Sequence, residues 1–172
     1  MHRMLEQASD YRLNPSLQLN CKTEINKFCS DIVERADPDK ELNGQVIKCL
    51  RTSFRQSRLT NKCEKEMANI LREQALDVRL NPLLKTVCKM ELEMICKMDD
   101  EDDPENVEEC LKSAFLGNHI ANKACQIEVA NMIEESQADI NVDPILQQSC
   151  AYDLLTFCGG IPQGNSRRKY CF

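Results

Sequence analysis

Residues 14–29 read NPSLQLNCKTEINKFC, and the same pattern returns at residues 81–96 as NPLLKTVCKMELEMIC and at residues 143–158 as DPILQQSCAYDLLTFC. Each copy opens with Asn or Asp followed by Pro, a pair that favours the N-cap and first turn of a helix. Apolar residues then recur at steps of three and four, which indicates an amphipathic helix. Three such starts predict three modules.

The cysteines extend this repeat over the whole chain. All 11 fall into two sets of four and one set of three. A fixed spacing of this kind is typical of a tandem array of small, disulfide-stapled units. The sets are Cys21, Cys29, Cys49 and Cys63, then Cys88, Cys96, Cys110 and Cys125, then Cys150, Cys158 and Cys171. We therefore predict the tail of a preceding repeat at residues 1–12, repeat one at 13–79, repeat two at 80–141 and a truncated repeat three at 142–172.

Two further helical stripes follow the first in each repeat. One surrounds Cys49 or Cys110, and the next begins near Cys63 or Cys125. With only five glycines and little alternation of β-branched residues, no strand is expected. The predicted fold is all-α, with tandem disulfide-stapled three-helix modules forming an elongated helical array.

Helix geometry limits how four cysteines can pair. If Cys21 and Cys29 share one helix, they lie about 12 Å apart along its axis, whereas a disulfide needs Cα atoms within about 7 Å. A nested and a crossed connectivity remain. Antiparallel packing brings Cys29 toward Cys49 and returns Cys63 to Cys21, so we favour the nested one. The predicted bridges are Cys21–Cys63, Cys29–Cys49, Cys88–Cys125, Cys96–Cys110 and Cys158–Cys171, with Cys150 unpaired because its partner would lie beyond residue 172.

Composition narrows the class of protein. Eleven cysteines in 172 residues indicate an oxidising compartment, and a net charge of −6 argues against a nucleic-acid partner. Residues 1–12 lack the apolar core of a signal peptide, and no stretch is apolar enough to span a bilayer, so any signal or anchor is expected outside this chain. No enzyme, metal or cofactor site is expected, because there is no C-x2-C pair, His2 and His119 lie away from the cysteines, and no nucleophile or phosphate-loop motif occurs.

The combined motif is N-P-x-L-x3-C-x2-E-x4-C, then C-L-[RK]-x2-F, then N-K shortly before a cysteine. It resembles the cysteine-rich repeats of the Golgi apparatus protein 1 family, whose members are also called cysteine-rich fibroblast growth factor receptor and E-selectin ligand 1. The resemblance implies a lumenal segment of a type I membrane glycoprotein of the Golgi and secretory pathway, reaching the cell surface. It also implies binding of fibroblast growth factors or other secretory-pathway proteins and presentation of glycans to E-selectin. This chain has no N-x-[ST] sequon, so we do not expect it to carry the N-linked sugar.

The densest negative charge of the sequence is an acidic run that begins at Asp99 in repeat two and continues to Glu108 and Glu109. Three interpretations stay open: a docking site for a basic growth factor, a calcium site and a solvated loop. The calcium interpretation lacks the alternating ligands and the glycine of an EF-hand loop. The candidate partner-binding residues are Asp99, Asp100, Glu101, Asp102 and Asp103.

Three other sets of residues carry predictions. A basic run along the second helix of repeat one, together with residues 167–169, is a candidate contact for sulfated glycan. An acid three residues after the first cysteine of each repeat suggests a structural cap or helix pairing. Several methionines near apolar positions are expected to fill the core. The sets are Lys48, Arg51, Arg55 and Arg58; Glu24, Glu91 and Asp153; and Met67, Met90, Met94, Met98 and Met132.

The leading hypothesis is a non-catalytic binding segment that offers rigid helical modules to growth factors or other secretory cargo. One alternative is a saposin-like lipid-binding module, since those are also small, helical and disulfide-stapled. Another is a purely structural spacer in a longer ectodomain.

Overall fold

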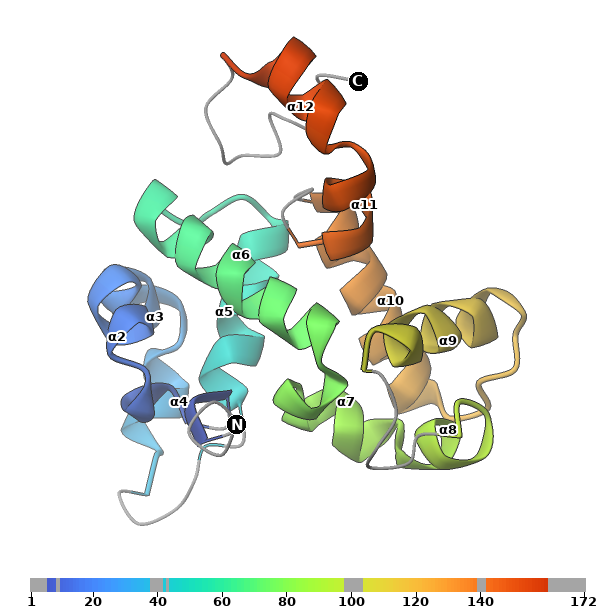
Figure 1. The fold of residues 1–172 in the computed structure, drawn as a ribbon. Helices are drawn as coiled ribbons and strands as arrows, with labels where there is room; N and C mark the ends of the chain where they lie inside the picture. The colour runs from blue at the N-terminus through green and yellow to red at the C-terminus, as the bar shows by residue number, and fades with distance from the viewer. Residues whose placement is uncertain are drawn as a thin grey trace.

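The computed structural model describes residues 6–8, 10–37, 42, 44–97, 104–138 and 142–160. Every regular element within these residues is a helix, which confirms the all-α prediction (Figure 1). Repeat one contains the 3-10 helix η1 (Tyr11–Leu13) and helices α2 (Pro15–Asn20), α3 (Lys22–Phe28), α4 (Ser30–Glu34), α5 (Gln45–Arg55) and α6 (Asn61–Leu76). Repeat two contains η2 (Val78–Leu80), α7 (Pro82–Val87), α8 (Lys89–Met94), α9 (Pro104–Leu116) and α10 (Lys123–Ala138), and α11 (Pro144–Ser149) and α12 (Ala151–Cys158) follow.

The predicted helix starts are confirmed in all three repeats. The side chain of Asn14 accepts a hydrogen bond from the backbone N–H of Leu17 at 3.0 Å. Asn81 and Asp143 do the same three residues downstream, at 3.1 Å and 2.9 Å. The proline that follows each cap occupies a first-turn position that needs no N–H donor. The repeated sequence therefore fixes where each module begins.

The first helix of each repeat is bent at its cysteine, whereas the apolar spacing predicts one straight helix. Cys21 has φ −114° and ψ 12°, and Cys88 and Cys150 lie close to the same values. Hydrogen bonds continue through the bend, from the Cys21 N–H to the Leu17 carbonyl and from the Ile25 N–H to the Cys21 carbonyl. Cys150 is bent although it is a free cysteine among the described residues, so the disulfide bond is not what imposes the bend.

Each of the first two repeats has its own hydrophobic core. The cores are built from the same positions: a leucine of the first helix, a leucine of the second helix and the cysteine of the third helix are fully buried in both. These are Leu17, Leu50 and Cys63 in repeat one and Leu84, Leu111 and Cys125 in repeat two. The two modules are therefore variations on one packing scheme.

Consecutive modules also pack side by side. Helix α10 of repeat two contacts α5 of repeat one, and α9 contacts α6. In Figure 1, α6 runs from above the blue helices α2 and α3 toward α7, and α9 and α10 lie on the side of α6 away from α2 and α3. The start of the third repeat returns to the first, because α11 contacts α6 and Val142 is buried in the core of repeat one. The array is thus held by lateral contacts as well as by its connecting helices.

Candidate functional site

Four disulfide bonds define the framework of the described repeats. Cys21 is bonded to Cys63 with Cα atoms 4.6 Å apart, and Cys88 is bonded to Cys125 at 4.9 Å. Each of these bonds joins the bend of the first helix to the first turn of the third. The second bond of each repeat joins the end of the first helical segment to the second helix: Cys29–Cys49 and Cys96–Cys110. This is the nested connectivity. Cys171, the predicted partner of Cys158, lies outside the described residues.

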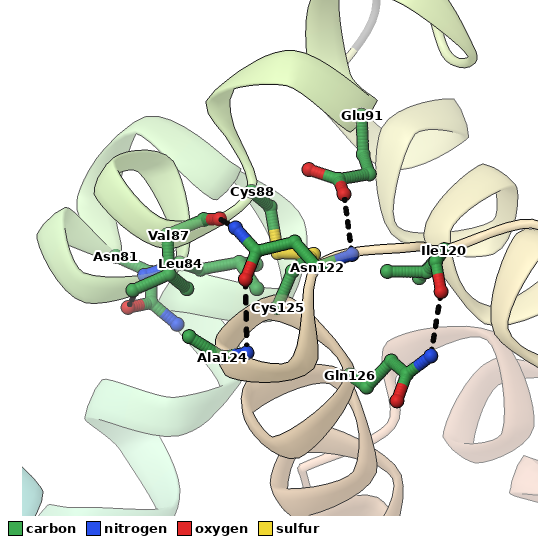
Figure 2. The surroundings of a disulfide bond; sticks show 10 residues. All are labelled: Asn81, Leu84, Val87, Cys88, Glu91, Ile120, Asn122, Ala124, Cys125 and Gln126. Atoms are coloured by element: carbon green, nitrogen blue, oxygen red, sulfur yellow. Dashed lines mark hydrogen bonds between the residues drawn. A yellow bond between two sulfur atoms is a disulfide. The ribbon is translucent and has the colours of Figure 1, made fainter.

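The acid three residues after the first cysteine of repeats one and two contacts the start of the third helix, as a structural cap would. Figure 2 shows Glu91 reaching the loop ahead of α10, where its Oε1 accepts a hydrogen bond from the Asn122 N–H at 3.4 Å. In the same loop, Asn122 donates to the Val87 carbonyl at 2.8 Å and accepts from the Ala124 N–H at 3.0 Å. These contacts seat α10 beside Cys88–Cys125, so the acid serves the fold rather than chemistry.

Glu24 plays the same part in repeat one. Its Oε1 accepts a hydrogen bond at 3.1 Å from the backbone N–H of Thr60, the N-cap residue of α6. Burial by itself raises the pKa of Glu24, but the hydrogen bonds from Thr60 outweigh it and hold the pKa below the ordinary value of glutamate. The ionised carboxylate is therefore the form that the fold stabilises.

A buried ion-pair cluster joins repeat one to repeat two. The guanidinium of Arg51 on α5 donates to both carboxylate oxygens of Glu135 on α10 at 2.8 Å, and it also pairs with Glu128. Arg55 adds a second contact to Glu135 at 2.8 Å. Arg51 is 3% exposed and Glu135 is 2% exposed. A two-pronged guanidinium–carboxylate pair of this kind fixes orientation as well as charge.

This cluster corrects the prediction of an exposed basic stripe on α5. Burial lowers the pKa of Arg51, but the pairs with Glu135 and Glu128 more than offset this, and its pKa is raised above the ordinary value. Arg51 is therefore charged and fully engaged inside the protein, and it is not available to a sulfated glycan. Lys48 and Arg58 are exposed, and residues 167–169 lie outside the described residues. Sequence reasoning missed the cluster because its members are 77 and 84 residues apart.

The candidate partner-binding residues Asp99, Asp100, Glu101, Asp102 and Asp103 lie outside the described residues. The ends of the segment that carries them are described. Cys96 and Cys110, bonded with Cα atoms 5.8 Å apart, close it into a short loop. Glu108 and Glu109, which the sequence appended to the acidic run, instead pair with Lys112 at 2.8 Å and 3.2 Å. Both carboxylates therefore have a cation within α9 itself.

Two methionines beside this loop are exposed, which corrects their assignment to the core. Met90 and Met94 are 67% and 72% exposed on α8, whereas Met67 and Met132 are buried as predicted. Met98 lies outside the described residues. Because Met90 and Met94 are four residues apart on one helix, they share a face.

A hollow with a volume of about 550 Å³ lies on repeat one. It is open, and its lining mixes apolar and polar side chains: Tyr11, Pro15, Gln18, Leu19, Lys22, Ile25 and Asn26. Within the described ranges, no group of three or more His, Cys, Asp or Glu side chains is placed to hold a metal ion. No helix in the described part of the chain is both long and apolar enough to cross a membrane.

Comparison with known proteins accounts for the repeat. The profile of a family described as "Cysteine rich repeat" matches residues 1–58, 61–117 and 123–171. The chain belongs to this cysteine-rich repeat family. The second and third matched units begin at the first residues of α6 and α10, so their boundaries differ from those of modules that start at Asn-Pro. No solved structure matches the chain.

The curated relatives are named Golgi apparatus protein 1 or, for the Caenorhabditis elegans protein, Golgi apparatus protein 1 homolog. The chicken protein (Gallus gallus) is 43% identical over 171 residues, covering 98% of this chain and 15% of the relative. The human protein (Homo sapiens) is 42% identical, with 98% and 14% covered, and a Caenorhabditis elegans homologue is 33% identical over 183 residues, with 98% and 16% covered. The cysteine-rich repeat chain thus spans about one-seventh of the length of these relatives. Their name agrees with the Golgi location expected from the sequence.

Proposed function

We propose that this segment is a non-catalytic binding module of the Golgi lumen and secretory pathway that binds a basic fibroblast growth factor. The contact surface would combine the acidic residues 99–103 with the exposed methionine face of α8. The observation that carries the proposal is the exposure of Met90 and Met94 on α8, the helix that leads into the segment closed by Cys96–Cys110. Membership of the cysteine-rich repeat family supports a repeat module rather than an enzyme.

Electrostatics supports a basic partner. Five consecutive acids in one short loop, on a chain of net charge −6, attract a cationic protein and raise its rate of association. The 14-residue separation of Cys96 and Cys110 keeps the two ends of the loop together. A loop closed in this way loses less conformational freedom on binding than an open one.

The methionine face would supply the apolar part of the contact. Methionine is enriched at protein interfaces and adapts to partners of different shape. Ile95, the residue that follows α8, is 39% exposed beside the same face. Exposed apolar side chains next to a polar rim are typical of a protein-binding surface.

The test is the affinity of the oxidised chain for basic fibroblast growth factor over a salt series. Replacing residues 99–103 with Ser should weaken binding about tenfold or more at low salt and flatten the salt dependence. Met90→Ser with Met94→Ser should weaken binding by a similar factor and leave the salt dependence unchanged. Leu19→Ser, which changes an exposed leucine on the far side of repeat one, is the matched control.

Unchanged affinity in both sets of variants would contradict the proposed surface. Binding that survives full reduction of the disulfides would contradict the need for a folded module. A liposome-flotation assay covers the lipid-binding alternative: flotation of the chain with neutral vesicles, lost in the methionine variant, would favour a saposin-like module over a growth-factor partner.

A further inference from the structure

The ion-pair cluster between the repeats has a counterpart position in repeat one. Helices α6 and α10 are both 16 residues long, and each carries its cysteine at the third position. Glu128 and Glu135, which hold Arg51, follow Cys125 by three and ten residues. Glu66 and Glu73 follow Cys63 at the same spacing. Repeat one therefore carries the same acidic pair on the same face of its third helix.

Within the described part of the chain, neither acid of this pair in repeat one contacts a cation. Glu73 is exposed and makes no ion pair among the described residues, and Glu66 accepts one hydrogen bond, from the Asn20 amide at 3.2 Å. Partial desolvation of its carboxyl group and the negative charge of Glu66 both raise the pKa of Glu73 above its ordinary value. Its counterpart Glu135 is 2% exposed and contacts two arginines. The equivalent glutamate is thus buried in repeat two and exposed in repeat one.

A hollow of about 100 Å³ lies beside Glu73. Its lining includes Gln7, Ala8 and Gln74. Gln74 is 7% exposed, and its amide donates to the Leu80 carbonyl while its Oε1 is buried without a hydrogen-bond partner among the described residues. A buried acceptor next to an open carboxylate suits a ligand with several N–H donors, as a guanidinium has.

The matching cation also recurs. Arg51 lies two residues after the cysteine of α5, and Lys112 lies two residues after the cysteine of α9. Both are basic, although Lys112 pairs with Glu108 and Glu109 of its own helix and lies 3.9 Å from Asp143 of the third repeat. A basic residue on helix two and an acidic pair on helix three are thus common to both complete repeats.

We infer that Glu66 and Glu73 form a docking site for the second helix of another cysteine-rich repeat, which inserts an arginine or lysine between them as Arg51 inserts between Glu128 and Glu135. The partner is a repeat whose third helix leads into Asp10. Residues 6–8 are helical and precede Asp10 as residues 73–75 of α6 precede Asp77. Asp10 and Asp77 each cap the 3-10 helix that follows, through the N–H of Arg12 and of Arg79. The entry to repeat one therefore copies the junction between repeats one and two.

The inference can be tested in a tandem protein in which residues 1–76 are placed directly before Asp10 of a second copy of residues 10–172. Leu76 is then joined to Asp10 as it is joined to Asp77 in the chain. The first-copy Arg51 should meet Glu66 and Glu73 of the second copy. Arg51→Gln in the first copy and Glu73→Gln in the second should show a coupling of about tenfold in the unfolding equilibrium constant. Arg72→Gln, an exposed change on the same helix, should not couple.

A second measurement is independent of how stable the tandem protein is. The pKa of Glu73, followed by carboxyl NMR in the 172-residue chain, should fall when a peptide of residues 44–58 with Cys49→Ser is added, because a guanidinium favours the ionised carboxylate. The same peptide with Arg51→Gln and Arg55→Gln should leave it unchanged. Additive variants in the tandem protein, together with an unmoved Glu73 pKa in the peptide titration, would overturn the inference.

Discussion

At the residue scale, Arg51 carries the contact between the two repeats. It is buried with two carboxylates and depends on them for its charge balance. Breaking such a cluster leaves uncompensated charge inside the protein, which costs more than the cluster itself contributes. The interface therefore tolerates replacement of the whole cluster better than loss of one member.

Arg51→Gln should lower the free energy of unfolding by about 3–5 kcal/mol, because Glu128 then remains buried without its cation and Glu135 keeps only its contact with Arg55. The triple change Arg51→Met, Glu128→Leu and Glu135→Leu should recover most of this loss. Urea denaturation at neutral pH measures both. A loss below about 1 kcal/mol in Arg51→Gln, equal to that of the exposed control Arg58→Gln, would show that the cluster does not hold the interface.

Glu24 gives the fold a pH dependence of known sign. Its folded-state pKa lies below that of an unfolded chain, so its cap on Thr60 stabilises the fold above the unfolded pKa and is lost as the pH falls through the folded pKa. Glu24→Gln should cost about 1–2 kcal/mol at pH 7 and much less in acid. Urea unfolding at pH 7 and pH 3 compares it with Asp31→Asn, an exposed change. An equal loss at both pH values would contradict the ionised cap.

At the element scale, sequence reasoning located the helix starts because they depend on neighbours in the chain. Asn-Pro specifies a cap and a first turn without any tertiary information. The bends at Cys21 and Cys88, by contrast, interrupt an amphipathic stripe that continues through them, so the apolar spacing gave no sign of them. The exposure of Met90 and Met94 was missed for a related reason: spacing alone does not say which apolar positions a neighbouring helix covers.

Asn81→Ala should lower the free energy of unfolding by about 1 kcal/mol, because the N–H of Leu84 loses its side-chain acceptor at the start of α7. Asn81→Asp should keep most of the stability, since repeat three uses Asp143 at this position. Thermal unfolding followed by circular dichroism tests the pair. Equal losses in Ala and Asp would mean that the cap is not the stabilising feature.

At the scale of the whole molecule, the disulfides contribute unequally. Cys21–Cys63 spans 42 residues and Cys96–Cys110 spans 14. In the chain-entropy account, the longer loop stabilises the fold by about 1 kcal/mol more. Replacing both cysteines of each pair with Ala should therefore cost more at Cys21–Cys63, and denaturant unfolding of the two double variants measures the difference. A larger loss at Cys96–Cys110 would contradict this ranking.

Much of the module follows from sequence and little of the assembly does. Cysteine spacing, helix caps and apolar stripes recur about every 60 residues, so the pattern of one repeat predicts the structure of the next. The lateral contact of α5 with α10 joins Arg51 to Glu135, and nothing in either local stretch marks the two as partners. The acidic pair on α6 became interpretable only when the structure showed what its counterpart on α10 holds.

The most direct test of the central claim is disulfide mapping, by mass spectrometry without reductant, of the chain produced in a secretory pathway. The account predicts Cys21 joined to Cys63, Cys29 to Cys49, Cys88 to Cys125 and Cys96 to Cys110. Crossed bridges such as Cys21–Cys49 with Cys29–Cys63, or free thiols at these eight cysteines in a chain that keeps its helical circular dichroism spectrum, would contradict it.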